Sequence, residues 1–106
     1  MPGKSTEITA AYNAALAKLQ AVLVSQDASK AEKKAATQSL NKLTAAKLAQ
    51  NLEVVEGRTA LLSTLIVELQ EITASIEVDS KIAAIATDLT GLLNQAQEIF
   101  EEEDEI

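Results

Sequence analysis

Carboxylates are the only abundant side chains in this sequence that could carry out acid–base or metal chemistry. The 106 residues include 16 aspartates and glutamates but no histidine and no cysteine. Histidine general bases, thiol nucleophiles and zinc sites of the usual cysteine–histidine type are therefore excluded. Carboxylate di-metal sites in helical bundles also use a Glu-x-x-His motif, which this chain cannot supply. We accordingly expect no metal site.

The spacing of the acids also argues against catalysis. Five glutamates fall outside the apolar stripe that is described below: Glu53, Glu56, Glu68, Glu71 and Glu77. Glutamates at such positions form a solvated helix face. The sequence also offers no nucleophile–base pair and no glycine-rich phosphate loop. We expect no catalytic residue, no cofactor and no enzymatic activity.

An apolar stripe with heptad spacing is the strongest structural signal in the chain. Its members recur at alternating intervals of four and three residues, with no proline among them, and we call them the central seam. The central seam comprises Leu48, Leu52, Val55, Thr59, Leu62, Ile66, Leu69, Thr73 and Ile76. Only a helix with a buried stripe needs this spacing. The sequence therefore predicts an all-α protein, with the central seam as its candidate self-association surface.

Polar breaks divide a single domain, residues 1–100, into helices over about 5–25, 29–56, 58–77 and 80–100. Ser29 and Glu32 form a Ser-x-x-Glu capping box, which predicts the start of the second helix. Residues 101–106 are acidic. We expect this tail to fray, because the C-terminus of a helix disfavours negative charge.

Gly57 decides between two antiparallel helical bundles. If the helix continues through it, a long central helix over about 29–78 is flanked by the first and last helices, and two chains form a dimeric rod four helices thick. If the helix breaks, one chain forms an up-and-down four-helix bundle with a turn at Gly57. The unbroken heptad on both sides favours continuity and places Gly57 on the outward side of the helix.

The predicted core consists of apolar side chains at seam positions of all four helices. It comprises Ile8, Leu16, Leu19, Leu23, Leu40, Leu48, Leu52, Val55, Leu62, Ile66, Leu69, Ile76, Ile82, Ile85, Leu89, Leu92 and Ile99. Further apolar side chains lie outside the central seam, namely Val54, Leu61, Leu65, Val67 and Ile72. In the long-helix rod, one neighbouring helix cannot cover so wide an apolar face, so a second chain has to cover it.

The formal net charge of −7 is unevenly distributed along the chain. Residues 1–50 hold seven lysines and three acids, a balance of +4, whereas residues 51–106 hold two cations and thirteen acids, a balance of −11. An antiparallel dimer sets the basic half of one chain beside the acidic half of the other. Together with the wide apolar face, this distribution predicts a homodimer.

These observations predict a non-catalytic structural or assembly protein that acts through helix-mediated self-association. The alternative is an acidic regulator, such as an inhibitor, immunity factor or chaperone, that binds a basic protein. Its candidate binding residues are the C-terminal acids Glu101, Glu102, Glu103, Asp104 and Glu105. The lysines between residues 30 and 47 lack the arginines and aromatics of a nucleic-acid surface, so we expect no nucleic-acid partner. The absence of a signal peptide and of a membrane-spanning apolar stretch predicts a cytoplasmic protein.

Overall fold

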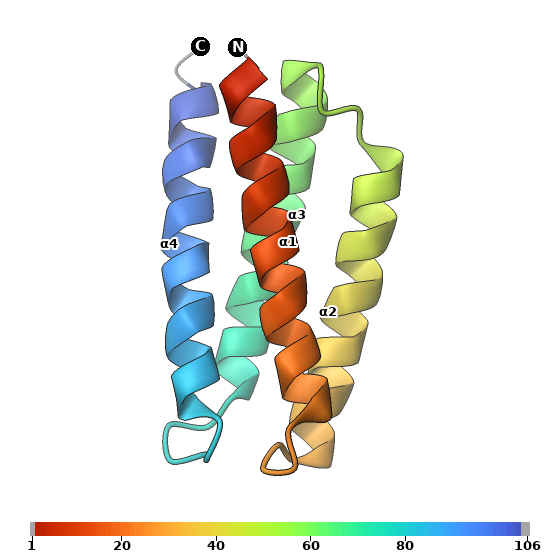
Figure 1. Ribbon diagram of the computed structural model, residues 1–106. Coiled ribbons are helices and arrows are strands. Elements are labelled where there is room, and N and C mark those ends of the chain that lie inside the picture. The colour runs from red at the N-terminus through yellow and green to blue at the C-terminus, as the bar shows by residue number, and fades with distance from the viewer. Residues whose placement is uncertain (1, 105–106) are drawn as a thin grey trace.

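Four helices make up the chain in a computed structural model, which describes residues 2–104 and the side chains of residues 5–102. The helices are α1 (Pro2–Val24), α2 (Lys30–Ala49), α3 (Val55–Ser75) and α4 (Ala83–Asp104). No strand occurs among residues 2–104. Successive helices run in opposite directions, as Figure 1 shows. The all-α class is confirmed, and of the two predicted bundles the chain adopts the single-chain, up-and-down one.

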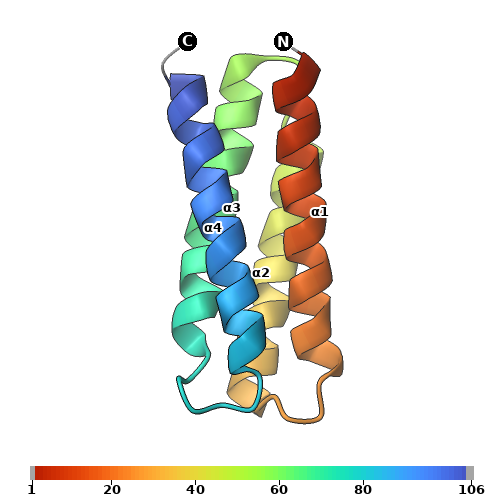
Figure 2. The same ribbon diagram turned by 60° about the vertical axis from the view of Figure 1, so that its left-hand side comes forward.

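Each helix packs against two neighbours, because contacts join α1 to α2, α2 to α3, α3 to α4 and α4 back to α1. Across the diagonals, contacts are found only between α1 and α3. The bundle measures 41 × 22 × 17 Å along its principal axes. Figures 1 and 2 show that the start of α1, the end of α4 and the α2–α3 turn share one end of the bundle. The other two connections lie at the opposite end.

The turn between α2 and α3 occupies residues 50–54, which corrects both the long helix over 29–78 and the predicted end of the second helix at residue 56. Hydrogen bonds to Asn51 stabilise this break. Asn51 Oδ1 accepts a hydrogen bond from the Glu53 backbone N–H at 3.0 Å, and the Asn51 carbonyl oxygen accepts one from the Val54 N–H at 3.3 Å. Asparagine that bonds the backbone two residues ahead offers the chain an alternative to helical hydrogen bonds.

Gly57 lies inside the first turn of α3 and is buried, so the predictions that it is outward-facing or forms the turn itself are wrong. A Cβ atom at this position would lie 2.1 Å from the carbonyl oxygen of Asn51. Real Cβ atoms do not approach backbone oxygens so closely. Glycine is therefore needed here because the preceding turn folds back against the start of α3.

The core follows the prediction in most positions and departs from it on α2. Eight of the predicted core residues are buried: Ile8, Leu19, Leu62, Leu69, Ile76, Ile82, Leu89 and Ile99. Seven more are partly buried against that core: Leu16, Leu23, Leu40, Leu52, Ile66, Ile85 and Leu92. Leu48 and Val55 are wrong predictions, since their exposed fractions are 84% and 43%.

The buried residues of α2 are Glu32, Ala36, Ser39 and Leu43, whereas the predicted core residue Leu40 is only partly buried and Leu48 is exposed. On α3, Leu61, Leu65 and Ile72 are fully buried although they lie outside the central seam. Neighbouring helices of the same chain therefore cover these three residues of the wide apolar face, whereas Val54 and Val67 are 47% and 45% exposed.

The second helix begins as predicted, with a complete capping box. Glu32 N–H donates to Ser29 Oγ at 3.1 Å, and Ser29 N–H donates to Glu32 Oε1 at 2.8 Å. These bonds satisfy two backbone donors that otherwise lack partners at a helix start. Glu32 is thereby held in a buried position, with 5% of its surface exposed.

Replacing the cap, Ser29→Ala, is expected to lower the free energy of unfolding by about 1 kcal/mol. Ser63→Ala is the matched control, because Ser63 is exposed within α3. Alanine there is expected to be neutral or slightly stabilising through its higher helix propensity. Urea denaturation of both variants measures the difference. Equal effects of the two substitutions would contradict the role of Ser29 as a cap.

The last helix is longer than predicted at its C-terminal end. α4 runs from Ala83 to Asp104, so residues 101–104 of the acidic tail are helical where we expected them to fray. Residues 105 and 106 lie outside the described residues. The α3–α4 connection spans residues 76–82, which is longer than the break that the sequence indicates. The tail acids are therefore carried at the end of the bundle by a helix.

Candidate binding surface at one end of the bundle

Most of the net negative charge lies at the end of the bundle that holds both chain termini. Glu53 in the α2–α3 turn, Glu56 in the first turn of α3, and Glu98 and Glu101 near the end of α4 meet at this end. All four side chains are exposed. We call these four glutamates the acidic end. Two more acids, Glu7 on α1 and Glu102 on α4, also lie there.

Two cations among the described side chains accompany the acids at this end, and both contact other groups of the chain. Lys47 Nζ lies 5.9 Å from the centre of the Tyr12 ring. Arg58 is buried, with 7% of its surface exposed, and its Nη1 donates to the carbonyl oxygens of Leu52 at 3.3 Å and Glu53 at 3.4 Å. Among the described side chains, the four glutamates of the acidic end have no ion-pair partner.

Ion pairs are found instead along the middle of the bundle and at its opposite end. Lys18 of α1 pairs with Asp88 of α4 at 3.1 Å. Lys42 of α2 lies 3.8 Å from both Glu68 and Glu71 of α3. These pairs join adjacent helices, so their acids serve the packing of the bundle.

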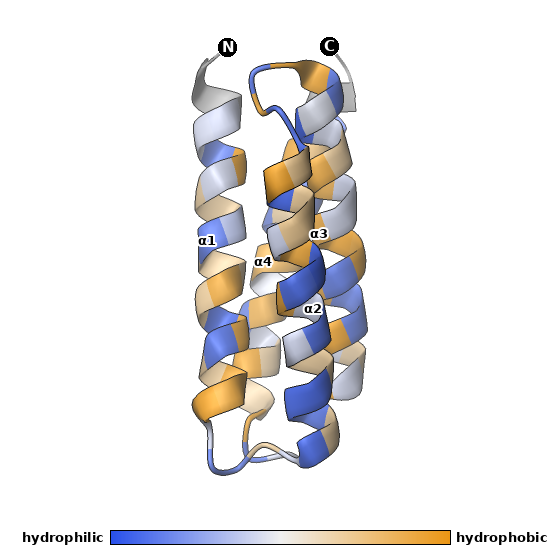
Figure 3. Ribbon diagram, turned by 90° about the vertical axis from the view of Figure 1, so that its right-hand side faces the viewer, coloured by the Kyte–Doolittle hydropathy of each residue, from blue (hydrophilic) through white to orange (hydrophobic). Residues whose placement is uncertain are grey.

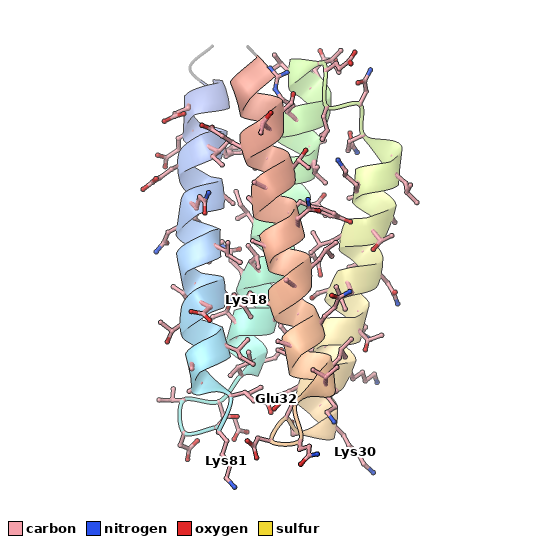
Figure 4. All side chains as sticks on the ribbon, viewed as in Figure 1. Lys18, Lys30, Glu32 and Lys81 are labelled. Atoms are coloured by element: carbon pink, nitrogen blue, oxygen red, sulfur yellow. The ribbon has the colours of Figure 1, made fainter. Side chains whose placement is uncertain are left out.

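The opposite end carries a balanced set of charges. Its lysines are Lys30, Lys33, Lys34 and Lys81, and its acids are Asp27, Glu32, Glu77 and Asp79. Figure 4 shows Lys30 and Lys81 reaching away from this end, and Figure 3 shows the hydrophilic part of α2 that leads to it. The two halves of the sequence differ in net charge, and in the folded chain the two ends of the bundle differ in net charge as well.

Exposed apolar side chains lie at both ends of the bundle: Val24 and Val78 at the opposite end are 80% and 96% exposed, and three more lie at the acidic end. Leu48 in the last turn of α2, Val54 in the turn and Val55 at the start of α3 are 84%, 47% and 43% exposed. A hollow of about 480 Å³ is lined by Leu52 and by α1 side chains that include Thr6, Thr9 and Asn13. Acidic groups next to exposed apolar groups form the usual anatomy of a protein-binding surface, in which apolar anchors are surrounded by a polar rim.

The structure separates the predicted central seam into two parts. Leu62, Leu69 and Ile76 are buried within the bundle, and Thr59, Ile66 and Thr73 are partly buried. Two N-terminal members of the seam, Leu48 and Val55, lie on either side of the α2–α3 turn and are exposed. Most of the seam is therefore used within one chain.

Of the predicted tail acids, Glu101 and Glu102 are exposed, whereas the side chains of residues 103–106 lie outside the described residues. The sequence pattern missed Glu53 and Glu56 as parts of the same surface, because only the turn at 50–54 brings them to the end of the bundle where α4 ends. Glu68 is also unlike the prediction: it is buried, with 4% exposed.

No group of three or more potential metal ligands occurs among the described residues. Within the same part of the chain, no helix is both long and apolar enough to cross a membrane. Comparisons with protein-family models, with curated proteins and with solved structures found no match to this chain.

Proposed function

We propose that this protein is a non-catalytic binding module that recognises a basic, amphipathic segment of another protein through the acidic end. The observation that supports this most strongly is the set of four exposed glutamates without ion-pair partners among the described side chains, beside exposed Leu48, Val54 and Val55. Complementary charge would steer the partner and fix its orientation. Burial of the apolar side chains would supply most of the binding free energy.

Self-association, the other function that the sequence suggests, has weaker support in a closed bundle. Leu62, Leu69 and Ile76 of the central seam are already buried by helices of the same chain. Two closed bundles could therefore use only the exposed part of the seam. Acids gathered at that same end would repel a second copy that docked end to end.

A matched pair of variants tests the proposed function. The first replaces the acidic end with glutamines (E53Q, E56Q, E98Q and E101Q), and the second neutralises four exposed acids elsewhere (E71Q, E77Q, D79N and D88N). Both variants change the formal net charge from −7 to −3. A fluorescent lysine- and leucine-rich amphipathic peptide serves as the probe, and its dissociation constant is measured by anisotropy at several salt concentrations.

The peptide is expected to bind the acidic-end variant about tenfold more weakly than the parent chain, since each exposed pair contributes a few tenths of a kcal/mol. The control variant should bind close to the parent affinity. Binding to the parent should weaken as salt rises. Equal losses in both variants would show that net charge alone attracts the peptide and would contradict the proposal.

A further inference from the structure

We propose that the α2–α3 turn, residues 50–54, is a hinge that can open into continuous helix, so that two copies of the chain exchange their α3–α4 hairpins and form a symmetric dimer. This inference concerns a second copy of the chain. Because the hinge lies at the acidic end, opening it brings the acidic ends of two copies together, and their repulsion should weaken as the salt concentration rises. Exchange of identical elements through a hinge is a route to dimers that needs no new interface.

The buried faces of α2 and α3 are in phase with each other across the turn. Leu43, the last buried residue of α2, and Leu61, a fully buried residue of α3, are 18 positions apart. At 3.6 residues per turn, 18 residues make five full helical turns. The same spacing of 18 positions relates Ser39 of α2 to Gly57 of α3, which are both buried. Two helices joined by a turn do not need this spacing between their buried residues. A single continuous helix does need it, because only then do the buried residues lie on one face.

The residues of the turn do not prevent helix formation. The segment Gln50–Val54 contains neither glycine nor proline, the two residues that most disfavour the interior of a helix. In an open chain the whole stretch from Lys30 to Ser75 could be one helix of 46 residues. Its length would be roughly 70 Å at 1.5 Å per residue.

The turn at 50–54 joins two hairpins, α1–α2 and α3–α4. Contacts between the hairpins run from α2 to α3, from α1 to α4 and from α1 to α3. In the exchanged dimer each α1–α2 hairpin would pack against the α3–α4 hairpin of the other copy in the same way. The ion pairs Lys42–Glu68 and Lys18–Asp88, which join the two hairpins, would be remade between chains. The arrangement is two-fold symmetric and therefore closes on itself.

Specific contacts hold the turn closed in the monomer. Ser5 Oγ donates to the carbonyl oxygen of Leu52 at 2.6 Å, and Arg58 Nη1 donates to the same oxygen. Asn51 stabilises the bend through its side chain, and its carbonyl oxygen packs where Gly57 has no Cβ. Because these contacts exist only when the turn is closed, their removal should favour the open chain.

Gly57→Ala tests the hinge, with Gly91→Ala as its matched control. Alanine at position 57 would clash with the Asn51 carbonyl oxygen in the closed turn, but it favours a continuous helix. Gly91 is exposed within α4, and a Cβ there meets no atom within 4 Å. Alanine at position 91 should stabilise closed and open forms equally. After refolding at matched concentrations, light scattering coupled to size exclusion is expected to give a dimerisation constant at least about tenfold larger for Gly57→Ala than for Gly91→Ala.

Two spin labels on one chain distinguish hinge opening from docking of closed bundles. Because the chain has no cysteine, exposed Lys34 on α2 and Ser75 on α3 can each be replaced by a labelled cysteine. Labelled chains are diluted into unlabelled ones, so that only distances within a chain are measured. A closed chain places the labels within about 20 Å, because α2 and α3 pack antiparallel. A continuous helix separates them by roughly 60 Å.

The proposal predicts that the Gly57→Ala dimer gives the long distance. A Gly57→Ala chain that remains a folded monomer would overturn it, and so would a dimer with only the short distance. If Gly57→Ala does not fold, Asn51→Ala is the second variant, since it removes the side-chain bond of the turn without adding a clash. A dimerisation constant of Asn51→Ala equal to that of Gly91→Ala would then overturn the hinge.

Discussion

Leu62→Ala is expected to lower the free energy of unfolding by about 2–5 kcal/mol, whereas Leu48→Ala should change it by less than about 0.5 kcal/mol. Both leucines belong to the central seam and occupy equivalent heptad positions, so the sequence pattern alone predicts similar losses. Leu62 is fully buried, and its removal leaves a cavity among packed side chains. Leu48 is 84% exposed, and its removal leaves no cavity.

Urea denaturation at constant pH measures both values. The comparison holds if neither substitution changes the slope of the unfolding free energy against urea concentration. The measurement should be made at a concentration where each variant is a monomer, because dimerisation would add to apparent stability. Similar losses at the two positions would mean that Leu48 is buried in solution. That outcome would contradict the turn at 50–54.

Arg58→Ala is the second substitution with a large expected effect, a loss of about 1.5–3 kcal/mol of unfolding free energy. The guanidinium group is buried and donates to two carbonyl oxygens of the α2–α3 turn. Those oxygens lie outside regular helical hydrogen bonding, so Arg58 acts as their cap. Removing this charged donor from a buried site costs more than removing an exposed charge, because the Glu53 carbonyl oxygen loses this hydrogen bond. The Leu52 carbonyl oxygen retains the hydrogen bond from Ser5 Oγ.

Lys34→Ala is the control for Arg58→Ala, since Lys34 is exposed on α2. Its effect on the free energy of unfolding should lie within about 0.5 kcal/mol. Amide hydrogen exchange gives a local readout, because loss of the cap should increase exchange in the turn and in the first turn of α3 before other regions. Unchanged stability of Arg58→Ala would contradict the capping role.

The sequence predicts helices well where a local signal marks their ends. The Ser29–Glu32 capping box places the start of α2 correctly, because that signal depends on only four neighbouring residues. The turn at 50–54 was missed because it contains no glycine or proline, and the one local signal within it is the side chain of Asn51, which bonds the Glu53 backbone N–H. The sequence instead indicated Gly57 as the only candidate position for a turn in this part of the chain. In the structure, Gly57 has the role of making room for the preceding turn.

The candidate surface was predictable only in part, for a related reason. Glu101 lies in the acidic tail that the sequence displays directly. Glu53 and Glu56 are about half the chain away from it, and only the position of the turn brings them to the same end. A heptad pattern likewise shows that a face is apolar but not which chain covers it. In this fold the covering helices belong to the same chain.

In the closed bundle, a single chain folds back on itself at residues 50–54. The spin-label distance between positions 34 and 75 of the otherwise unchanged chain tests it most directly, at a concentration where light scattering gives the monomer mass of 11.2 kDa. The closed bundle predicts one separation within about 20 Å, set by two helices packed side by side. A single separation of roughly 60 Å in that monomeric sample would mean that α2 and α3 form one continuous helix, and would contradict the account.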